Sequence, residues 1–177
     1  MKAVAILCGG RGTRLGYAGQ KCMIPIDGKP FLAYKLDLLC KQGATEFHLL
    51  CAHKVVDVFQ GIGTEWKGRP VKYYVDPGVS ALDAHARAAK HMPFVHWLTY
   101  GDSIFDVPLK HSMFPYVVGN KEFTDAGLLY CWGASYRGLR KFHDVPAVHC
   151  NTQDDLVRAV SYLQRRGLAS AGSQLDR

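Results

Sequence analysis

The feature that most constrains this chain is an apolar run near its start that passes directly into glycines. Residues 3–8 read AVAILC, and residues 9–12 read GGRG. Six consecutive apolar residues that end at a turn predict a strand buried on both faces, which is typical of parallel sheets. Glycines let the backbone turn sharply after such a strand, and successive N–H groups in the turn can bind an anion. Because Arg11, Arg14 and Lys21 add positive charge, the segment predicts a polyphosphate site.

Strand and helix patterns then alternate along the chain. Strands are predicted at 3–8, 46–52, 71–75, 96–100 and 127–132, and helices at 30–43, 55–60, 80–92, 107–114 and 152–166. Two of these helices begin with a capping-box pattern, Ser80 with Asp83 and Thr152 with Asp155. Such alternation favours parallel βαβ units, so we expect a Rossmann-like α/β fold, layered α/β/α, with a mostly parallel central sheet in a compact form.

The same topology predicts where a ligand binds. Right-handed crossovers place the loops that follow parallel strands at one edge of the sheet, where ligands bind in open α/β folds. The glycine loop follows the first strand, and Asp102 follows the fourth. We therefore expect the glycine loop and Asp102 to lie together at that edge.

The length and composition fit a single domain whose cysteines are reduced. We expect a single domain over residues 1–167 and a flexible C-terminal tail over residues 168–177 of the 177-residue chain. No run of about 18 apolar residues predicts a membrane span, and the start does not read as a signal peptide. The six cysteines form no CxxC pair, and Cys8 and Cys51 lie in apolar strands. These features predict a cytoplasmic protein without zinc or membrane contacts.

The charge bears on the class of partner. The formal net charge is +7, which permits nucleic-acid binding. However, no dense Lys/Arg block with interleaved aromatic residues is present, so we expect no nucleic-acid partner. A basic surface with one site for an anionic small molecule is the simpler interpretation.

Two common phosphate-binding loops do not match. A P-loop requires GxxxxGK[ST], which the chain lacks. A dinucleotide fingerprint requires GxGxxG, but Leu15 stands where the third glycine belongs. It also expects an acidic residue after the second strand, and that strand ends at Ala52-His53.

A third pattern fits. The segment GGRGTRL at 9–15, followed by Lys21 in QKCMIPIDGKPFLAY, resembles the signature of the sugar-1-phosphate nucleotidylyltransferases, or NDP-sugar pyrophosphorylases. LTYGDSIFDV around Asp102 and CNTQDDL at 150–156 resemble two later elements of that family. The LTYGD segment is similar to the cytidylyltransferase branch, and heptose guanylyltransferases are similar nearby, so the nucleobase stays open.

The resemblance implies a GT-A-like nucleotidyltransferase fold and an Mg²⁺-dependent reaction. In that family a nucleoside triphosphate and a sugar-1-phosphate give an NDP-sugar and pyrophosphate. By resemblance, Arg14 neutralises the leaving pyrophosphate, Lys21 bridges the phosphates of both substrates, and Asp102 holds Mg²⁺, a metal that prefers oxygen ligands. The residues implied to contact the nucleotide are Leu7, Gly9, Gly10, Arg11, Gly12, Thr13, Gly78, Ser80 and Gly101.

The chain also departs from the family pattern. Cys22 stands where a proline usually follows the lysine, and the second metal ligand is open between Asn151 and His149. The stretch in which family members build the acceptor pocket is short, with Asp125 as its candidate substrate contact. Two alternatives therefore stay open: transfer to a non-sugar phosphate acceptor, and a catalytically weak nucleotide-binding regulatory protein. The oligomeric state is not predicted.

Overall fold

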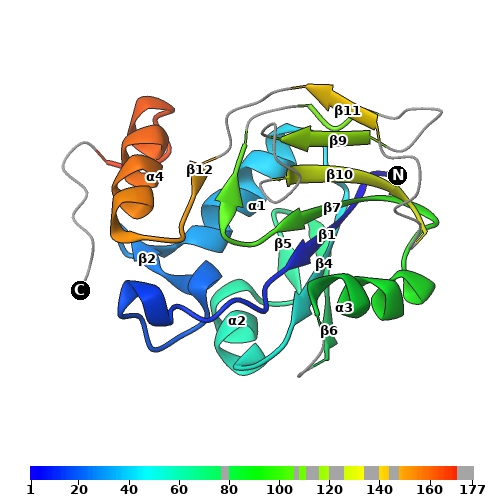
Figure 1. The fold of residues 1–177 in the computed structure, drawn as a ribbon, viewed down its shortest axis with the longest axis horizontal. Coiled ribbons are helices and arrows are strands. Elements are labelled where there is room, and N and C mark those ends of the chain that lie inside the picture. The colour runs from blue at the N-terminus through cyan, green and yellow to red at the C-terminus, as the bar shows by residue number, and fades with distance from the viewer. Residues whose placement is uncertain are drawn as a thin grey trace.

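The computed structural model describes residues 1–76, 80–105, 108–110, 116–119, 126–133, 140–143 and 148–170. Its long strands are β1 (Ala3–Leu7), β4 (Glu46–Cys51), β6 (Arg69–Val75), β7 (Val95–Tyr100) and β10 (Ala126–Trp132). Three shorter strands are β5 (Glu65–Trp66), β9 (Tyr116–Gly119) and β11 (Arg140–His143). Within the described residues they form one sheet in the order β11-β9-β10-β7-β1-β4-β6-β5, and Figure 1 labels these strands.

The centre of this sheet is parallel. β1 pairs in parallel with both β4 and β7, and β4 pairs in parallel with β6. Leu7 lies opposite Leu50 on one side and Tyr100 on the other, so the carboxyl ends of these strands are level. β10 and β9 then continue the sheet in antiparallel pairing. The predicted mostly parallel sheet is thus confirmed.

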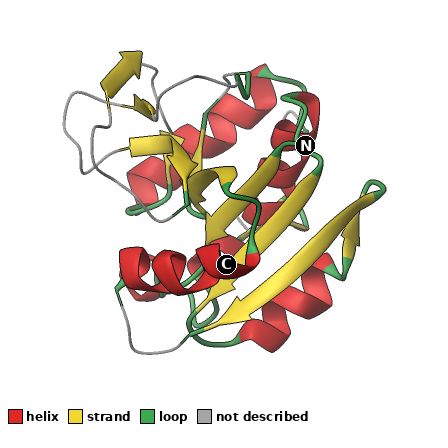
Figure 2. Ribbon diagram, turned by 90° about the vertical axis from the view of Figure 1, so that its right-hand side faces the viewer, coloured by secondary structure: helices red, strands yellow, loops and turns green. Residues whose placement is uncertain are grey.

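Helices cover both faces of the sheet. They are α1 (Phe31–Lys41), α2 (Val55–Ile62), α3 (Ala81–Ala88) and α4 (Gln153–Arg165). Side chains alternate along β1, so Ile6 packs in the core with α1 and α2 while Ala5 packs with Ala88 of α3. The predicted α/β/α layering is therefore confirmed, and Figure 2 shows helices on both sides of the strands.

Local sequence signals predicted the starts of α1, α3 and α4. α1 begins after Pro30, and the chain leaves it through Gly43 at a φ of +92°. Ser80 caps α3, although the helix is shorter than predicted because a 3₁₀ turn replaces its end at Ala89–His91. Thr152 and Asp155 form the predicted capping box of α4. Most of the helix predicted at 107–114 lies outside the described residues.

A small second sheet brings the C-terminal segment back to the end of β7. β8 (Ser103–Ile104) pairs antiparallel with β12 (Val148–His149), and the Cys150 N–H donates to the Asp102 carbonyl over 2.9 Å. α4 then packs through Leu156 and Leu163 on the outer part of α1. These contacts place the start of α4 beside Asp102.

Two further features concern membrane spans and the C-terminal segment. Among the described helices, none is both long and apolar enough to cross a bilayer. Of the tail expected over 168–177, residues 171–177 lie outside the described residues. The Leu168 N–H still bonds the Leu163 carbonyl over 2.9 Å, so the start of that segment stays on the end of α4.

Candidate active site

The glycine loop after β1 folds back on itself. Arg11 forms an isolated β-bridge with Gln20, and the Lys21 N–H donates to the Gly10 carbonyl over 3.0 Å. Gly12 is needed for this path, because a Cβ there would lie 2.9 Å from the Tyr17 carbonyl oxygen. The loop therefore returns Lys21 to the carboxyl end of β1.

Lys21 lies where two distant segments meet. Its Nζ is 2.6 Å from Asp102 Oδ2 and also donates to Asn151 Oδ1. Both Lys21 and Asp102 are largely buried, with side chains 12% and 24% exposed. The structure thus brings together the loop lysine, the predicted aspartate and one of the two candidates for the second ligand.

The donor atoms at this point fit Mg²⁺. A carboxylate oxygen and an amide oxygen converge on one cationic group, the Lys21 ammonium. Oxygen ligands of this kind, completed by water and phosphate oxygens, are what Mg²⁺ prefers. The backbone of His149 pairs with Ser103 in the small sheet, while its side chain lies outside the described part of the chain. Asp102 and Asn151 are therefore two described residues that could hold a magnesium ion.

Two cavities flank Lys21. The larger, of about 280 Å³, lies at the carboxyl ends of β1, β4, β6 and β7 and reaches the first turns of α3. The smaller, of about 200 Å³, lies between the glycine loop and Asn151. Lys21 lines both cavities, so one ammonium group faces two adjoining ligand spaces.

The predicted nucleotide contacts divide between these cavities. Leu7, Gly9 and Gly10 line the larger cavity, and the smaller is lined by Arg11, Gly12, Thr13 and Arg14. Arg11 and Arg14 are both exposed, and neither forms an ion pair with any residue that the structure describes.

Two other predicted residues have different surroundings. Gly101 is buried, and its N–H donates to the Leu7 carbonyl over 2.9 Å. Ser80 caps α3, where its hydroxyl accepts from the Asp83 N–H. Gly78 and Asp125 lie outside the described residues.

The sequence analysis missed part of the wall of the larger cavity. Tyr74, Asp76 and Tyr100 line it, together with the thiols of Cys8, Cys22 and Cys51. Tyr74 and Asp76 stand at the carboxyl end of β6, and that position was a signal that could have found them. Hydrogen bonds to Cys22 and Cys51, together with burial, raise the pKa of the Cys8 thiol, so it stays protonated.

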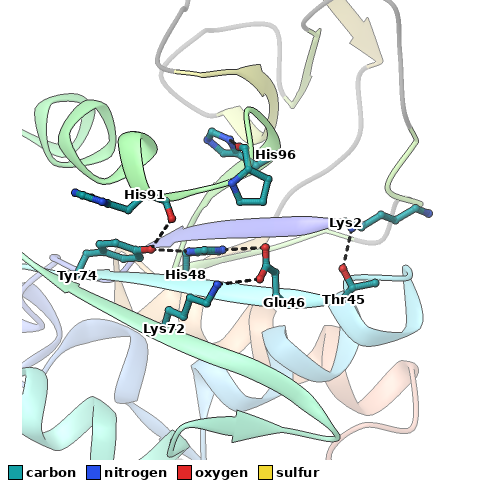
Figure 3. A network of polar contacts seen from close by, with 9 residues as sticks. Lys2, Thr45, Glu46, His48, Lys72, Tyr74, His91 and His96 are labelled. Atoms are coloured by element: carbon teal, nitrogen blue, oxygen red, sulfur yellow. Dashed lines mark hydrogen bonds and ion pairs between the residues drawn. The ribbon is translucent and has the colours of Figure 1, made fainter.

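Tyr74 is held by a polar network on the α3 side of the sheet (Figure 3). Its hydroxyl lies 3.0 Å from His48 Nδ1 and donates to the His91 carbonyl over 3.3 Å. Glu46 extends the network. One of its carboxylate oxygens lies 3.3 Å from His48 Nε2, and the other lies 3.2 Å from Lys72 Nζ. The network fixes the aromatic ring at the cavity wall.

A buried lysine beneath Asp102 was also missed. Lys35, in the middle of α1, is 2% exposed, and its Nζ lies 3.0 Å from Thr99 Oγ1 and 2.5 Å from the Ser103 carbonyl oxygen. Burial lowers the pKa of Lys35 to about 7, and the negative charge of Asp102 opposes that shift. Lys35 is three residues after Leu32 on the apolar stripe of α1, so a charged residue on that face was the available signal.

Comparison with known proteins gives one family. Residues 4–112 match the model of the MobA-like NTP transferase domain. The chain is 34% identical, over 115 residues, to D-glycero-α-D-manno-heptose 1-phosphate guanylyltransferase from Campylobacter jejuni. It is 32% identical, over 114 residues, to the UTP–glucose-1-phosphate uridylyltransferase AglF from Haloferax volcanii. Each match covers 62% of this chain but only 51% and 46% of the respective relative, so the chain spans about half their length.

Solved structures share the fold at lower identity. HddC from Yersinia pseudotuberculosis, crystallised with GMP-PN, superposes with a TM-score of 0.72 at 17% identity, covering 92% of this chain and 100% of that one. A glucose-1-phosphate thymidylyltransferase from Bacillus anthracis gives a TM-score of 0.71 at 14% identity, covering 92% of this chain and 95% of that one.

The family match contains the glycine loop, Lys21 and Asp102, and the shared fold extends over nearly the whole chain. Both findings agree with the strand-end site described above. The chain therefore belongs to the MobA-like NTP transferase family.

Proposed function

We propose that this protein transfers a nucleotidyl group from a nucleoside triphosphate to a sugar-1-phosphate. The observation that carries the proposal is the position of Lys21, which lines two adjoining cavities and contacts both Asp102 and Asn151. A reaction between two phosphates needs one cation that reaches both reactants. The named relatives, which act on heptose 1-phosphate and glucose-1-phosphate, support a sugar phosphate as the acceptor.

The two cavities together support a placement of the nucleoside triphosphate. The larger one, walled by Leu7, Tyr74 and Tyr100, suits a nucleoside, because nucleoside pockets combine apolar walls with a few polar groups. The triphosphate then extends past Gly10 toward the smaller cavity, where Arg11 and Arg14 are exposed.

The chemistry requires positioning and charge neutralisation. An oxygen of the acceptor phosphate forms a bond to the α-phosphorus, and the bond from that phosphorus to the bridging oxygen breaks, so that the electron pair leaves with pyrophosphate. Because the nucleophile belongs to the substrate, no catalytic serine, cysteine or histidine is needed. Lys21 holds the two phosphates together, and Arg14 stabilises the negative charge on the leaving group.

Asp102 and Asn151 are proposed to hold Mg²⁺. When bound, the ion neutralises phosphate charge that the lysine and arginine side chains leave uncompensated. The Lys21 ammonium contacts both of these oxygens in the structure and would hold the phosphates of the two substrates.

The test is pyrophosphate release by the full chain with Mg²⁺. Each of ATP, CTP, GTP and UTP is combined with hexose and heptose 1-phosphates and, in separate reactions, with phosphorylated alcohols. The expected result is pyrophosphate in equal amount to an NDP-sugar of the correct mass, with loss of turnover in Asp102→Asn. A product formed only from a phosphorylated alcohol would contradict the sugar assignment. No pyrophosphate from any combination would contradict the enzyme assignment and favour a nucleotide-binding regulatory protein.

A further inference from the structure

The turn that carries Asp102 is bonded to the buried amino group of Lys35. Lys35 donates to Thr99 Oγ1, three residues before Asp102, and to the Ser103 carbonyl, one residue after it. Thr99 and Ser103 are both fully buried. The two bonds therefore hold the turn on either side of Asp102, from the side of α1.

The surroundings leave Lys35 little freedom. Its Nζ also lies 4.6 Å from the centre of the Phe105 ring, which provides a cation–π contact. Keeping an ammonium group 2% exposed is costly, because burial disfavours the charged form. A methionine or leucine would fill the same position on α1 without that cost. Packing alone therefore does not explain a lysine at this position.

Lys35 and Lys21 contact the Asp102 turn in different ways. Lys21 bonds the carboxylate directly and reaches it from a loop at the edge of two cavities. Lys35 bonds the residues that flank Asp102 and is closed off from solvent. Lys21 therefore lies where a bound ligand would touch it, whereas Lys35 is enclosed by the protein.

We propose that Lys35 is a positioning residue, which fixes the Thr99–Ser103 turn so that the Asp102 carboxylate is held ready for the metal ion and the triphosphate. This inference rests on the proposed function of the site. It assigns to α1 a direct part in building the metal site, in addition to its part in the core.

The test compares the Mg²⁺ dependence of pyrophosphate release in matched variants. Lys35→Met keeps the length and apolar bulk of the side chain but removes the donors, and Lys41→Met changes an exposed lysine in the last turn of the same helix. We expect Lys35→Met to raise the half-saturating Mg²⁺ concentration by about tenfold to a hundredfold, as for other residues that orient metal ligands. Lys41→Met should match the wild-type protein.

Two further variants separate positioning from stability. Thr99→Val removes one acceptor and should shift the Mg²⁺ dependence in the same direction, by less. Lys35→Met combined with Thr99→Val removes both partners of the Lys35–Thr99 bond but leaves the Ser103 carbonyl, so the melting temperature of the double variant should recover part of the way to the wild-type value. If the Mg²⁺ dependence of the double variant stays shifted, Lys35 acts as a positioning residue. Thr99→Val alone decides the question if Lys35→Met fails to fold.

Three outcomes would overturn the proposal. The first is a wild-type Mg²⁺ dependence in Lys35→Met, or in Thr99→Val where only that variant folds. The second is a defect that disappears with the recovered melting temperature of the double variant, because Lys35 would then act only through stability. The third, a wild-type protein without turnover, would contradict the proposed function as well and is distinguished by that control.

Discussion

Lys21 reaches both cavities because the glycine loop returns it to Gly10. Under the proposed function, replacing this lysine removes the cation that would face both phosphates, while the short 3₁₀ turn around it keeps its other contacts. We expect Lys21→Ala to lower kcat by about a hundredfold to a thousandfold, the range for losing one group that stabilises developing charge. Steady-state kinetics measure this loss. Lys90→Ala, at an exposed lysine beside α3, serves as control, and a Lys21→Ala enzyme with wild-type kcat would contradict the role.

Replacing each of two glycines of the site by alanine should have different effects on stability. A Cβ on Gly101 would lie 3.0 Å from the Leu7 carbonyl oxygen and 3.3 Å from Cys8 Sγ, whereas one on Gly10 would meet nothing closer than 3.6 Å. We expect Gly101→Ala to lower the free energy of unfolding by about 1–3 kcal/mol, the usual cost of overpacking. Gly10→Ala should leave it nearly unchanged. Urea denaturation measures both, and equal stability of the two variants would contradict the account.

The site residues divide by the kind of signal that they give in the sequence. The glycine loop, Lys21 and Asp102 were predictable, because a motif and strand-end positions mark them. Tyr74 was missed because it reads as an ordinary strand residue, and only the fold of β6 turns it to the cavity. Lys35 was missed because the apolar stripe around it was interpreted only as core packing. Burial of a charge is decided by tertiary contacts, which sequence periodicity does not give.

At the element scale, the start of α4 determines where Asn151 lies. The capping box of Thr152 and Asp155 closes the first turn, and Asp155 Oδ2 also accepts from the Asn151 N–H over 3.2 Å. We expect Thr152→Ala to cost about 1 kcal/mol of stability, as is typical for a lost N-cap. It should also weaken Mg²⁺-dependent nucleotide binding, because the turn that holds Asn151 loosens. Val157→Ala, at an exposed position on α4, should do neither. Thermal denaturation and nucleotide titration give both readouts, and wild-type values in Thr152→Ala would contradict this role of the cap.

Elements were predictable in proportion to their length and periodicity. The long strands β1, β4, β6 and β7 and the capped helices carry clear patterns, and the structure confirms them. β5, β8 and β12 have two residues each, too few to show alternation. β10 was found as a strand, but its antiparallel pairing with β7 depends on the path of the intervening chain. For the same reason, the return of β12 to β8 could not be foreseen.

Across the whole molecule, buried histidines on the α3 face link stability to pH. His85 Nε2 lies 2.6 Å from His96 Nε2, and His96 Nδ1 is 2.9 Å from the Pro93 carbonyl oxygen. A carbonyl only accepts, so neutral His96 carries its proton on Nδ1 and accepts from His85. Burial lowers the pKa of His85 to about 4, and it also lowers the pKa of His96 and of His48. The folded protein therefore favours the neutral imidazoles.

The sign of the pH dependence follows from these lowered pKa values. Unfolded His85 takes up a proton near its ordinary pKa of 6.5, whereas folded His85 does so only near 4. Its contribution to stability is therefore full above about pH 6.5 and is lost as the pH falls toward 4, by about 3 kcal/mol. Urea denaturation from pH 4 to 8 should show a shallower acid slope in His85→Gln than in wild type. The exposed-site control His91→Gln should keep the wild-type slope, and an unchanged slope in His85→Gln would contradict the assignment.

The most direct test of the central claim, that Lys21, Asp102 and Asn151 form a nucleotide–metal site, is thermal denaturation with each nucleoside triphosphate, with and without Mg²⁺. A ligand at 100 times its Kd stabilises the folded state by about 2.7 kcal/mol, or roughly 5–10 °C for a chain of this size. We predict such a rise with at least one triphosphate, larger with Mg²⁺ and reduced in Asp102→Asn, with NAD as a control that gives none. No rise with any triphosphate, or a full Mg²⁺-dependent rise in Asp102→Asn, would contradict the account.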